Sequence, residues 1–191
     1  MNLKGTQTEK NLLLAYTGES NNRNMYTFFS DQARKEGYEQ IGAIFSETAG
    51  HEREHARQEL NLIQDSDIEL ATLVYPVKGI GNTRANLETA VSGERYEQQI
   101  MYPEFAQTAE DEGFPDIARL LRHIADVEAY HEKRFLSLLR LIKQRSVFQR
   151  DRAVTWKCRV CGYLKMDQSA PLNCPICECD RAHFEVLDEH F

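Results

Sequence analysis

Two clusters of glutamate and histidine carry the chemistry that this sequence can support. Residues 51–55 (His-Glu-Arg-Glu-His) contain the His-Glu-x-x-His pattern of zinc proteases, in which two imidazoles one helical turn apart hold zinc and the glutamate acts as a base. The same stretch, taken from Glu52, is Glu-x-x-His, which supplies half of a carboxylate-bridged site for two metal ions. A second Glu-x-x-His lies at Glu128 and His131.

An internal repeat distinguishes these two interpretations. The second half of the chain matches the first at an offset of 76 residues: Gly37 and Gly113, Ile41 and Ile117, Glu52 and Glu128, His55 and His131, Leu60 and Leu136. On the preceding helix, Gly18 and Glu19 match Gly93 and Glu94 at an offset of 75, so the two parts of the repeat differ by one residue. At the position equivalent to His51 the second half has Val127, so only Glu-x-x-His is repeated. The protease interpretation is therefore disfavoured, and His51 is interpreted as a solvated histidine or as a neighbour of a metal ligand.

The elements that must position these residues are long helices. The apolar spacing between residue 6 and about 145 is helical. Four helices are predicted, from the capping-box spacing Thr6-x-x-Glu9 to Gly37, from 38 to 64, from 83 to Glu112, and from Pro115 to about Arg145. The stretch between the second and third helices has no such spacing and contains proline and glycine, as expected of a crossover connection. A duplicated helical hairpin with one long crossover predicts a mainly α protein, the ferritin-like four-helix bundle.

Several glutamates fall on the apolar faces of these predicted helices, which should be dry. They are Glu19, Glu52, Glu94, Glu97 and Glu128. Unpaired carboxylates in a core prevent folding unless cations neutralise them. Arg23 and Arg95 could pair with one or two of them in a salt-bridge network, but two histidines converge on the same faces, which favours metal.

The resulting candidate ligands are Glu19, Glu52, His55, Glu94, Glu97, Glu128 and His131. Oxygen-rich ligation with one imidazole per metal and open positions suits iron or manganese and disfavours a closed structural zinc site. Glu97 lies one turn beyond Glu94 on the same face, and its counterpart in the first half is Asn22. The predicted pocket is therefore asymmetric at this position.

All five cysteines lie between residues 158 and 179. Cys158-x-x-Cys161 and Cys174-x-x-Cys177 form two knuckles, which together predict a tetrahedral four-thiolate metal site. Sulfur ligation suits zinc or iron and does not choose between them. Cys179 is interpreted as a free thiol or as a neighbour of the site.

The cysteine map also predicts the domains: a four-helix bundle over 1–146, a linker over 147–153 and a metal-knuckle domain over 154–191. The last segment is too short to fold by apolar burial alone, so metal is expected to be a condition of its folding. Its expected small core consists of Trp156, Tyr163 and Phe184, which could alternatively be exposed for docking.

Composition narrows the compartment and the partners. A formal net charge of -7 makes nucleic acid and anionic membranes improbable partners, because both would be repelled. The N-terminus has no secretory signal pattern, and no apolar run is long enough to span a membrane. A cytoplasmic location is expected.

The chain resembles the rubrerythrin family, in which a ferritin-like di-iron domain is fused to a rubredoxin-like domain. The resemblance rests on Gly18-Glu19-Ser20, Gly93-Glu94-Arg95-Tyr96-Glu97, Met101-Tyr102-Pro103, residues 128–135 and Cys158-Arg159-Val160-Cys161-Gly162-Tyr163. It covers nearly the whole sequence and shows no departure at a ligand position.

The resemblance implies an oxo-bridged di-iron centre (Fe–O–Fe), a mononuclear Fe(Cys)4 site and reduction of hydrogen peroxide to water in oxidative-stress defence. Glu52 and Glu128 look like bridging carboxylates, Glu97 resembles a ligand that exchanges with redox state, and Tyr26 and Tyr102 match tyrosines beside the metals. It also implies a head-to-tail homodimer or higher homo-oligomer. The implied electron donor is an NAD(P)H-dependent rubredoxin-type reductase or a rubredoxin.

Two other functions are compatible with parts of the sequence. The bundle alone would suit a ferroxidase or iron-handling protein, which has no need of a fused thiolate domain. A tail that holds zinc would instead suit an electron carrier or interaction module stapled by that metal.

Overall fold

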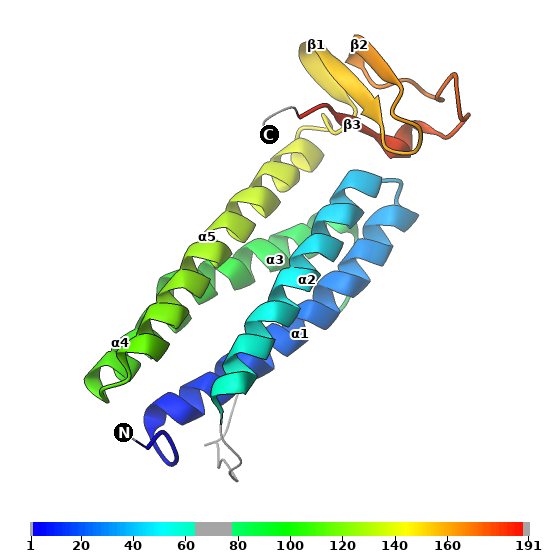
Figure 1. Cartoon of the computed structure of the whole chain (residues 1–191). Helices are drawn as coiled ribbons and strands as arrows, with labels where there is room; N and C mark the ends of the chain where they lie inside the picture. The colour runs from blue at the N-terminus through cyan, green and yellow to red at the C-terminus, as the bar shows by residue number, and fades with distance from the viewer. Residues whose placement is uncertain (1, 64–77, 189–191) are drawn as a thin grey trace.

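The computed structural model describes residues 2–63 and 78–188 and shows a helical bundle with a small sheet domain at one end (Figure 1). Most of the expected crossover, residues 64–77, lies outside the described part. The described helices are α1 (Gln7–Lys35), α2 (Glu39–Leu62), α3 (Thr83–Tyr96), α4 (Tyr102–Asp111) and α5 (Pro115–Lys143). The mainly α, ferritin-like fold expected from the repeat is confirmed. Among the described residues, no helix is long and apolar enough to cross a membrane.

The helix predicted to run unbroken from 83 to 112 is interrupted. Residues Glu97–Met101 form a π-helical turn, η1, between α3 and α4. Tyr102 lies eight positions after Glu94, whereas Tyr26, in the equivalent pair, lies seven positions after Glu19. A π turn absorbs one additional residue within a helix, and this is why the repeat offset changes from 75 to 76 within this stretch.

The helix ends follow local sequence signals. The Thr6 side chain accepts a hydrogen bond from the Glu9 backbone N–H at 3.1 Å and caps the start of α1. Gly37 and Gly113, with φ of 80° and 81°, follow α1 and α4 at equivalent positions of the repeat. In each case the glycine and the residue after it donate to carbonyls of the last turn, which is the Schellman arrangement.

The core of the bundle consists of two apolar clusters. One contains Phe29, Phe45 and Phe135 and lies toward the sheet domain. The other contains Leu12 and Leu121 and lies toward the opposite end of the bundle. Along each long helix the predicted metal ligands fall between the residues of these two clusters. The bundle therefore encloses a polar layer in the middle of its core.

The C-terminal domain is a three-stranded antiparallel sheet with strand order β2-β1-β3. Its strands are β1 (Gln149–Cys158), β2 (Leu164–Ser169) and β3 (Phe184–Val186), with a short 3-10 helix, η2 (Arg181–His183), before β3. Trp156 and Phe184 are buried and Tyr163 packs partly against them, which confirms the expected small core.

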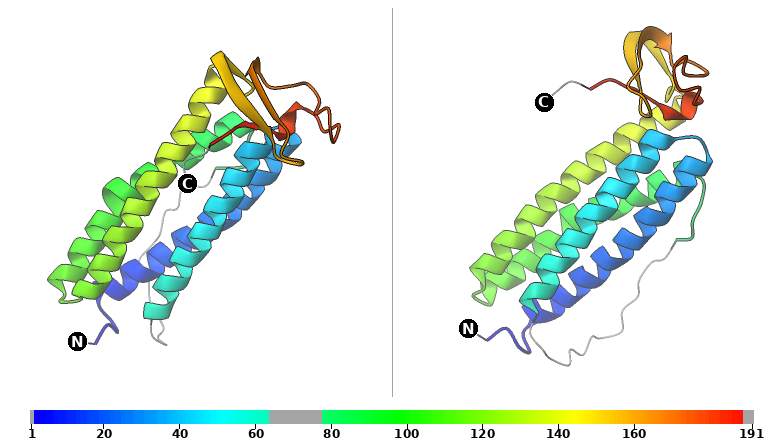
Figure 2. Two further views of the ribbon diagram at one scale, coloured as in Figure 1. Left: turned by 45° about the horizontal axis from the view of Figure 1, so that its top comes forward. Right: turned by 45° about the vertical axis from the view of Figure 1, so that its right-hand side comes forward.

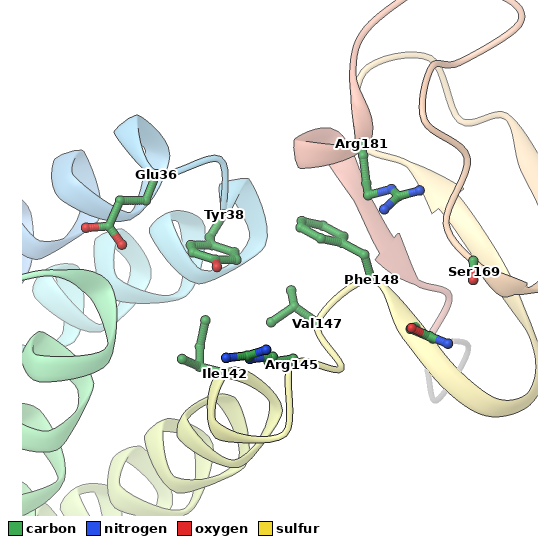
Figure 3. Close-up of a pocket in the computed structure, with 9 residues that line it drawn as sticks. Glu36, Tyr38, Ile142, Arg145, Val147, Phe148, Ser169 and Arg181 are labelled. Carbon is green, nitrogen blue, oxygen red and sulfur yellow. The ribbon is translucent and has the colours of Figure 1, made fainter.

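This sheet domain sits on the end of the bundle formed by the α1–α2 turn and the end of α5 (Figures 1 and 2). The rings of Tyr38 and Phe148 stack across the junction with centroids 6.1 Å apart and an interplanar angle of 9°. Both rings line a cleft that also includes Ile142 and Arg181 (Figure 3). Residue Gln149, at which β1 begins, lies within the stretch predicted as linker.

Candidate metal centres

All seven ligands predicted for the bundle are buried. Most of them form two overlapping groups whose ligand atoms lie within 4.8 Å of one another: Glu19, Glu52, His55 and Glu128, and Glu52, Glu94, Glu128 and His131. Each group contains a histidine and three carboxylates drawn from three helices. The helical spacing of the sequence therefore does bring these residues together in the polar layer.

Glu52 and Glu128 belong to both groups, and each presents one oxygen to each histidine. Glu52 Oε2 lies 3.2 Å from His55 Nδ1, and Glu52 Oε1 lies 3.3 Å from His131 Nδ1. Glu128 Oε1 lies 2.9 Å from His55 Nδ1, and Glu128 Oε2 lies 2.7 Å from His131 Nδ1. This arrangement fits two carboxylates that bridge a pair of metal ions.

The donor set fits metal better than a salt-bridge network. Buried oxygens of Glu19, Glu94 and Glu97 have no hydrogen-bond partner among the described residues, and the oxygens of Glu52 and Glu128 face the imidazoles of His55 and His131. Arg95 pairs with Glu132 at 2.7 Å, and Arg23 donates to Asn24, so neither arginine neutralises the layer. Orphaned carboxylate oxygens at this depth require cations. The alternative of a structural salt-bridge network is therefore wrong for these residues.

The electrostatics point the same way. Burial raises the pKa values of Glu19, Glu94 and Glu97 well above that of an ordinary glutamate, and neighbouring carboxylates raise them further. Burial also acts to raise the pKa of Glu128, but hydrogen bonds with the two imidazoles lower it to about 2. Burial disfavours the charged form of His131, yet its carboxylate neighbours raise its pKa to about 12. The carboxylate layer therefore favours the binding of positive charge, either as protons on these side chains or as metal cations that compete with those protons.

Glu97 makes the pocket asymmetric, as the repeat comparison predicts. It lies at the start of the π turn, and its Oε1 accepts a hydrogen bond of 2.8 Å from the Asn22 side-chain amide. Asn22 is its counterpart in the first half. The other oxygen, Oε2, has no partner among the described residues and remains free to bind a cation.

Two buried tyrosines hold the outer glutamates across the repeat. The Tyr26 hydroxyl donates to Glu94 Oε1 at 2.6 Å, and the Tyr102 hydroxyl is hydrogen-bonded to Glu19. Tyr102 has a second carboxyl partner, Glu59, at 2.9 Å. The sequence interpretation missed Glu59, although it lies seven residues after Glu52 and therefore on the same helix face.

His51 lies beside the site and is not simply solvated. Its Nδ1 is 3.0 Å from His131 Nε2, and the two rings stack with centroids 5.2 Å apart. Because His131 faces the carboxylates through Nδ1, His51 contacts the nitrogen on the far side of that ring. His51 is therefore a neighbour of a candidate ligand, which was one of its two expected roles.

The sulfurs of all five cysteines gather in the sheet domain. Four of them, from Cys158, Cys174, Cys177 and Cys179, lie within 4.8 Å of one another, and Cys161 Sγ lies 3.5 Å from Cys174 Sγ. Burial acts to raise the pKa of Cys158, but backbone N–H groups of the first knuckle help to lower it to about 6. Backbone N–H groups of the second knuckle likewise help to lower the pKa of Cys174. This N–H···S pattern is what two metal-binding knuckles require.

Cys179 lies closer to this site than its position outside the knuckles suggests. Its Sγ is 3.5 Å from both Cys158 Sγ and Cys177 Sγ. Burial and these two neighbours raise its pKa, which favours the neutral thiol. The knuckle set of Cys158, Cys161, Cys174 and Cys177 and the compact set that includes Cys179 thus share three sulfurs.

Comparison with known proteins places this architecture in a family. The family profile described as rubrerythrin matches residues 10–139, and the profile described as rubrerythrin, rubredoxin-like domain, matches residues 156–185. The chain belongs to the rubrerythrin family. The rubrerythrin of Porphyromonas gingivalis is 46% identical over 189 residues, which cover 99% of this chain and 94% of that protein. The rubrerythrin of Nitratidesulfovibrio vulgaris is 46% identical over 185 residues, covering 97% and 96%.

Among solved structures, nigerythrin in a mixed-valence state matches with a TM-score of 0.65 and 29% identity, covering 97% of this chain and 88% of that chain. Another nigerythrin structure, described as fully reduced and all ferrous, matches with a TM-score of 0.64. As a member of the rubrerythrin family, the chain is an oxidoreductase with a di-iron carboxylate site in its bundle and a rubredoxin-like iron site in its C-terminal domain.

Proposed function

We propose that this protein is a peroxidase that reduces hydrogen peroxide to two water molecules in oxidative-stress defence. The observation that carries the proposal is the presence, in one chain, of a two-metal carboxylate site and a one-metal thiolate site. Reduction of one hydrogen peroxide to two water molecules needs two electrons and two protons. When bound, the iron pair supplies these two electrons, and the thiolate iron supplies replacements one at a time.

The chain's own residues would hold the metals as follows. Glu52 and Glu128 would bridge the two ions, because each offers one oxygen to either side. Glu19 and His55 would complete one side, and Glu94 and His131 would complete the other. In the sheet domain we assign the knuckle cysteines, Cys158, Cys161, Cys174 and Cys177, as ligands, because each Cys-x-x-Cys can direct two sulfurs at one ion and Cys179 belongs to neither pair.

Glu97 would be the carboxylate that changes ligation between redox states. Its Oε1 accepts a hydrogen bond from Asn22, its Oε2 has no partner among the described residues, and the first half of the repeat has no equivalent carboxylate. Tyr26 and Tyr102 would keep the outer glutamates in place through their hydroxyls. A site with one exchangeable carboxylate can respond to a small oxidant on one side without losing the other ligands.

Electrons would reach the bundle from a second copy of the chain. The sheet domain contacts the α1–α2 turn, and the stretch of α2 from Glu39 to His55 corresponds to about 24 Å of helix. Electron tunnelling weakens steeply over such distances. A head-to-tail homodimer, or a higher homo-oligomer built from it, would bring each thiolate site close to the partner's bundle site.

Exposed apolar residues around the knuckles offer a surface for such contacts. They are Val160, Leu172 and Ile176, each more than half exposed. The same surface would receive an electron donor, an NAD(P)H-dependent rubredoxin-type reductase or a rubredoxin. We further propose a cytoplasmic location and the domain boundaries 1–146 and 154–191.

The test is anaerobic reduction of the iron-loaded protein followed by rapid mixing with stoichiometric peroxide or oxygen. We expect both iron sites to be oxidised much faster by peroxide than by oxygen, with two electrons consumed per peroxide. Faster oxidation by oxygen with growth of an iron mineral would instead identify an iron-handling protein. Metal analysis that found zinc in the freshly isolated protein, together with a visible spectrum that lacked the thiolate-iron bands, would identify a tail that holds zinc.

A further inference from the structure

One buried carboxyl group of the bundle is not among the candidate metal ligands. Glu59 on α2 is fully buried, and its Oε2 has no hydrogen-bond partner among the described residues. Its equivalent in the second half of the repeat, 76 residues on, is Phe135, which is a buried member of an apolar cluster. One half of the bundle thus has an acid where the other half has a core phenylalanine.

The neighbours of these two residues differ accordingly. Tyr26 donates to a single carboxylate, Glu94, and its ring packs edge-on against Phe135 with centroids 5.3 Å apart. Tyr102 is the equivalent tyrosine, and its hydroxyl lies within hydrogen-bond distance of two carboxyl groups, Glu19 and Glu59. Glu59 therefore contacts the buried tyrosine on one side of the site only.

Counting protons constrains this arrangement. A phenol has one proton to donate, and an ionised carboxylate can only accept. If Glu19 and Glu59 were both ionised, one of them would face the phenol oxygen without a hydrogen between them, which is costly in a buried site. One of the two carboxyl groups must therefore carry its own proton and donate it to Tyr102.

The two clusters of candidate metal ligands identify which carboxyl group carries the proton. Glu19 belongs to a cluster of candidate ligands and binds a metal as a carboxylate. Glu59 belongs to neither cluster in the bundle. Burial raises the pKa of Glu59 to about 8, against the opposing effect of its hydrogen bond with Tyr102. The neutral acid is thus favoured at Glu59 by its surroundings as well as by the proton count.

We propose that Glu59 is a positioning residue of the di-iron site: as a neutral acid it donates to the Tyr102 phenol oxygen and so directs the single phenol proton at Glu19. The proposal rests on the assignment of Glu19 as a ligand under the proposed function. A fixed hydrogen bond to Oε1 of Glu19 leaves Oε2, which has no other partner among the described residues, to face the metal. Partners of this kind orient metal ligands and tune the metal.

The first test is infrared difference spectroscopy of the iron(II)-loaded protein. Subtraction of the Glu59→Gln spectrum from that of the wild type should reveal the carbonyl stretch of a protonated carboxylic acid. Glu54→Gln, which removes an exposed carboxylate from the same helix, should not remove this band. If the band is absent from the Glu59 difference spectrum, Glu59 is ionised and the proposal is wrong.

The second test is anaerobic iron(II) titration of the wild type and two variants. Glu59→Gln keeps a donor to Tyr102 and should bind iron(II) within about twofold of wild type, whereas Glu59→Leu should bind about tenfold more weakly. Glu59→Leu replaces a buried acid with an apolar side chain and is expected to fold. Equal affinity of Glu59→Leu and wild type would contradict the proposal. Neither measurement involves peroxide, so both outcomes are independent of the peroxidase test.

Discussion

The two imidazoles of the bundle site face its carboxylates through Nδ1, and the two rings differ in what supports the other ring nitrogen, Nε2. For His131 this support comes from His51, whose Nδ1 lies 3.0 Å from His131 Nε2. The equivalent of His51 in the second half is Val127, which cannot form a hydrogen bond through its side chain. The two sides of the site are therefore supported differently.

Replacement of His51 by alanine should weaken metal binding on the His131 side. Loss of a partner that orients a ligand typically costs about 10–100-fold in metal affinity, and we expect a loss in this range. Iron(II) titration of the metal-free protein measures it. The control is His123→Ala, which removes an exposed histidine from α5. Equal affinities of the two variants would show that the contact between His51 and His131 does not support the ligand.

Replacement of Glu97 by alanine should leave the fold and the thiolate site intact and slow peroxide turnover by about tenfold or more. The reason is that Glu97, whose Oε2 has no partner among the described residues, has no carboxylate counterpart in the first half of the repeat, where Asn22 occupies its position. Gln99→Ala is the matched control, because Gln99 is an exposed residue of the same π turn. Unaltered turnover in Glu97→Ala would remove this residue from the mechanism.

At the scale of elements, each half of the repeat caps a helix of the other half. Glu36, just after α1, accepts hydrogen bonds of 3.0 and 3.2 Å from the backbone N–H of Thr83 at the start of α3. Glu112, just after α4, accepts from the backbone N–H groups of Gln7 and Thr8 at 3.0 and 2.8 Å, at the start of α1. A carboxylate at a helix N-terminus satisfies free N–H groups and interacts favourably with the helix dipole.

Replacement of Glu112 by alanine should lower the free energy of unfolding by about 1 kcal/mol at neutral pH, as expected for loss of a cap. Partial burial alone would raise the pKa of Glu112, but its hydrogen bonds with Thr8 and Gln7 lower it. The stabilisation is therefore complete above the unfolded value of about 4.3 and is lost as the pH falls through the lower folded value. The difference in free energy of unfolding between wild type and variant should shrink as the pH falls through the folded pKa of Glu112.

This prediction is tested by denaturant unfolding of the metal-loaded proteins between neutral pH and pH values below the pKa of ordinary glutamate. Wild type and variant have the same metal ligands, so release of metal by acid affects both alike and the difference between them reports the cap. Glu104→Ala, which removes an exposed carboxylate from the same helix, is the control. A constant difference between Glu112→Ala and wild type across this range would exclude the capping role.

At the scale of the whole molecule, the placement of the sheet domain separates the two metal sites within one chain. The sheet domain contacts the end of the bundle through the Tyr38–Phe148 stack, whereas the carboxylate layer lies in the middle of the bundle core. Electron transfer between chains is the arrangement that this separation favours. The thiolate site should therefore be replaceable without loss of the bundle site.

Replacement of Cys161 by serine should abolish iron binding in the sheet domain and stop turnover with the biological reductant, while the bundle site still assembles. Metal analysis and the visible spectrum report the two sites separately. Cys179→Ser is the matched control, and because Cys179 lies outside both knuckles this variant should retain the thiolate iron. Loss of that iron in Cys179→Ser but not in Cys161→Ser would show that the compact cysteine set binds the metal instead. Full turnover by a Cys161→Ser protein without thiolate iron would exclude the electron relay.

The sequence by itself determined the features that depend on spacing along one helix or one loop. Glu-x-x-His places two ligands on one helix face, the 76-residue repeat duplicates that face, and each Cys-x-x-Cys forms its knuckle locally. The bundle, its carboxylate layer and the thiolate site were predictable because helical periodicity and short loops fix these relations before any long-range contact forms.

Only the tertiary structure decided the features that join residues distant in sequence. The contact of His51 with His131 and the hydrogen bond of Glu59 with Tyr102 cross between helices, and Cys179 reaches the thiolate site through the fold of its loop. The repeat contained one signal that the sequence interpretation did not use: Glu59 is equivalent to Phe135, which is a buried core residue. The change of the repeat offset from 75 to 76 did not by itself identify the π turn. The turn was recognised only when the structure showed that the helix absorbs the additional residue. Such contacts depend on how helices pack, which spacing within one helix does not specify.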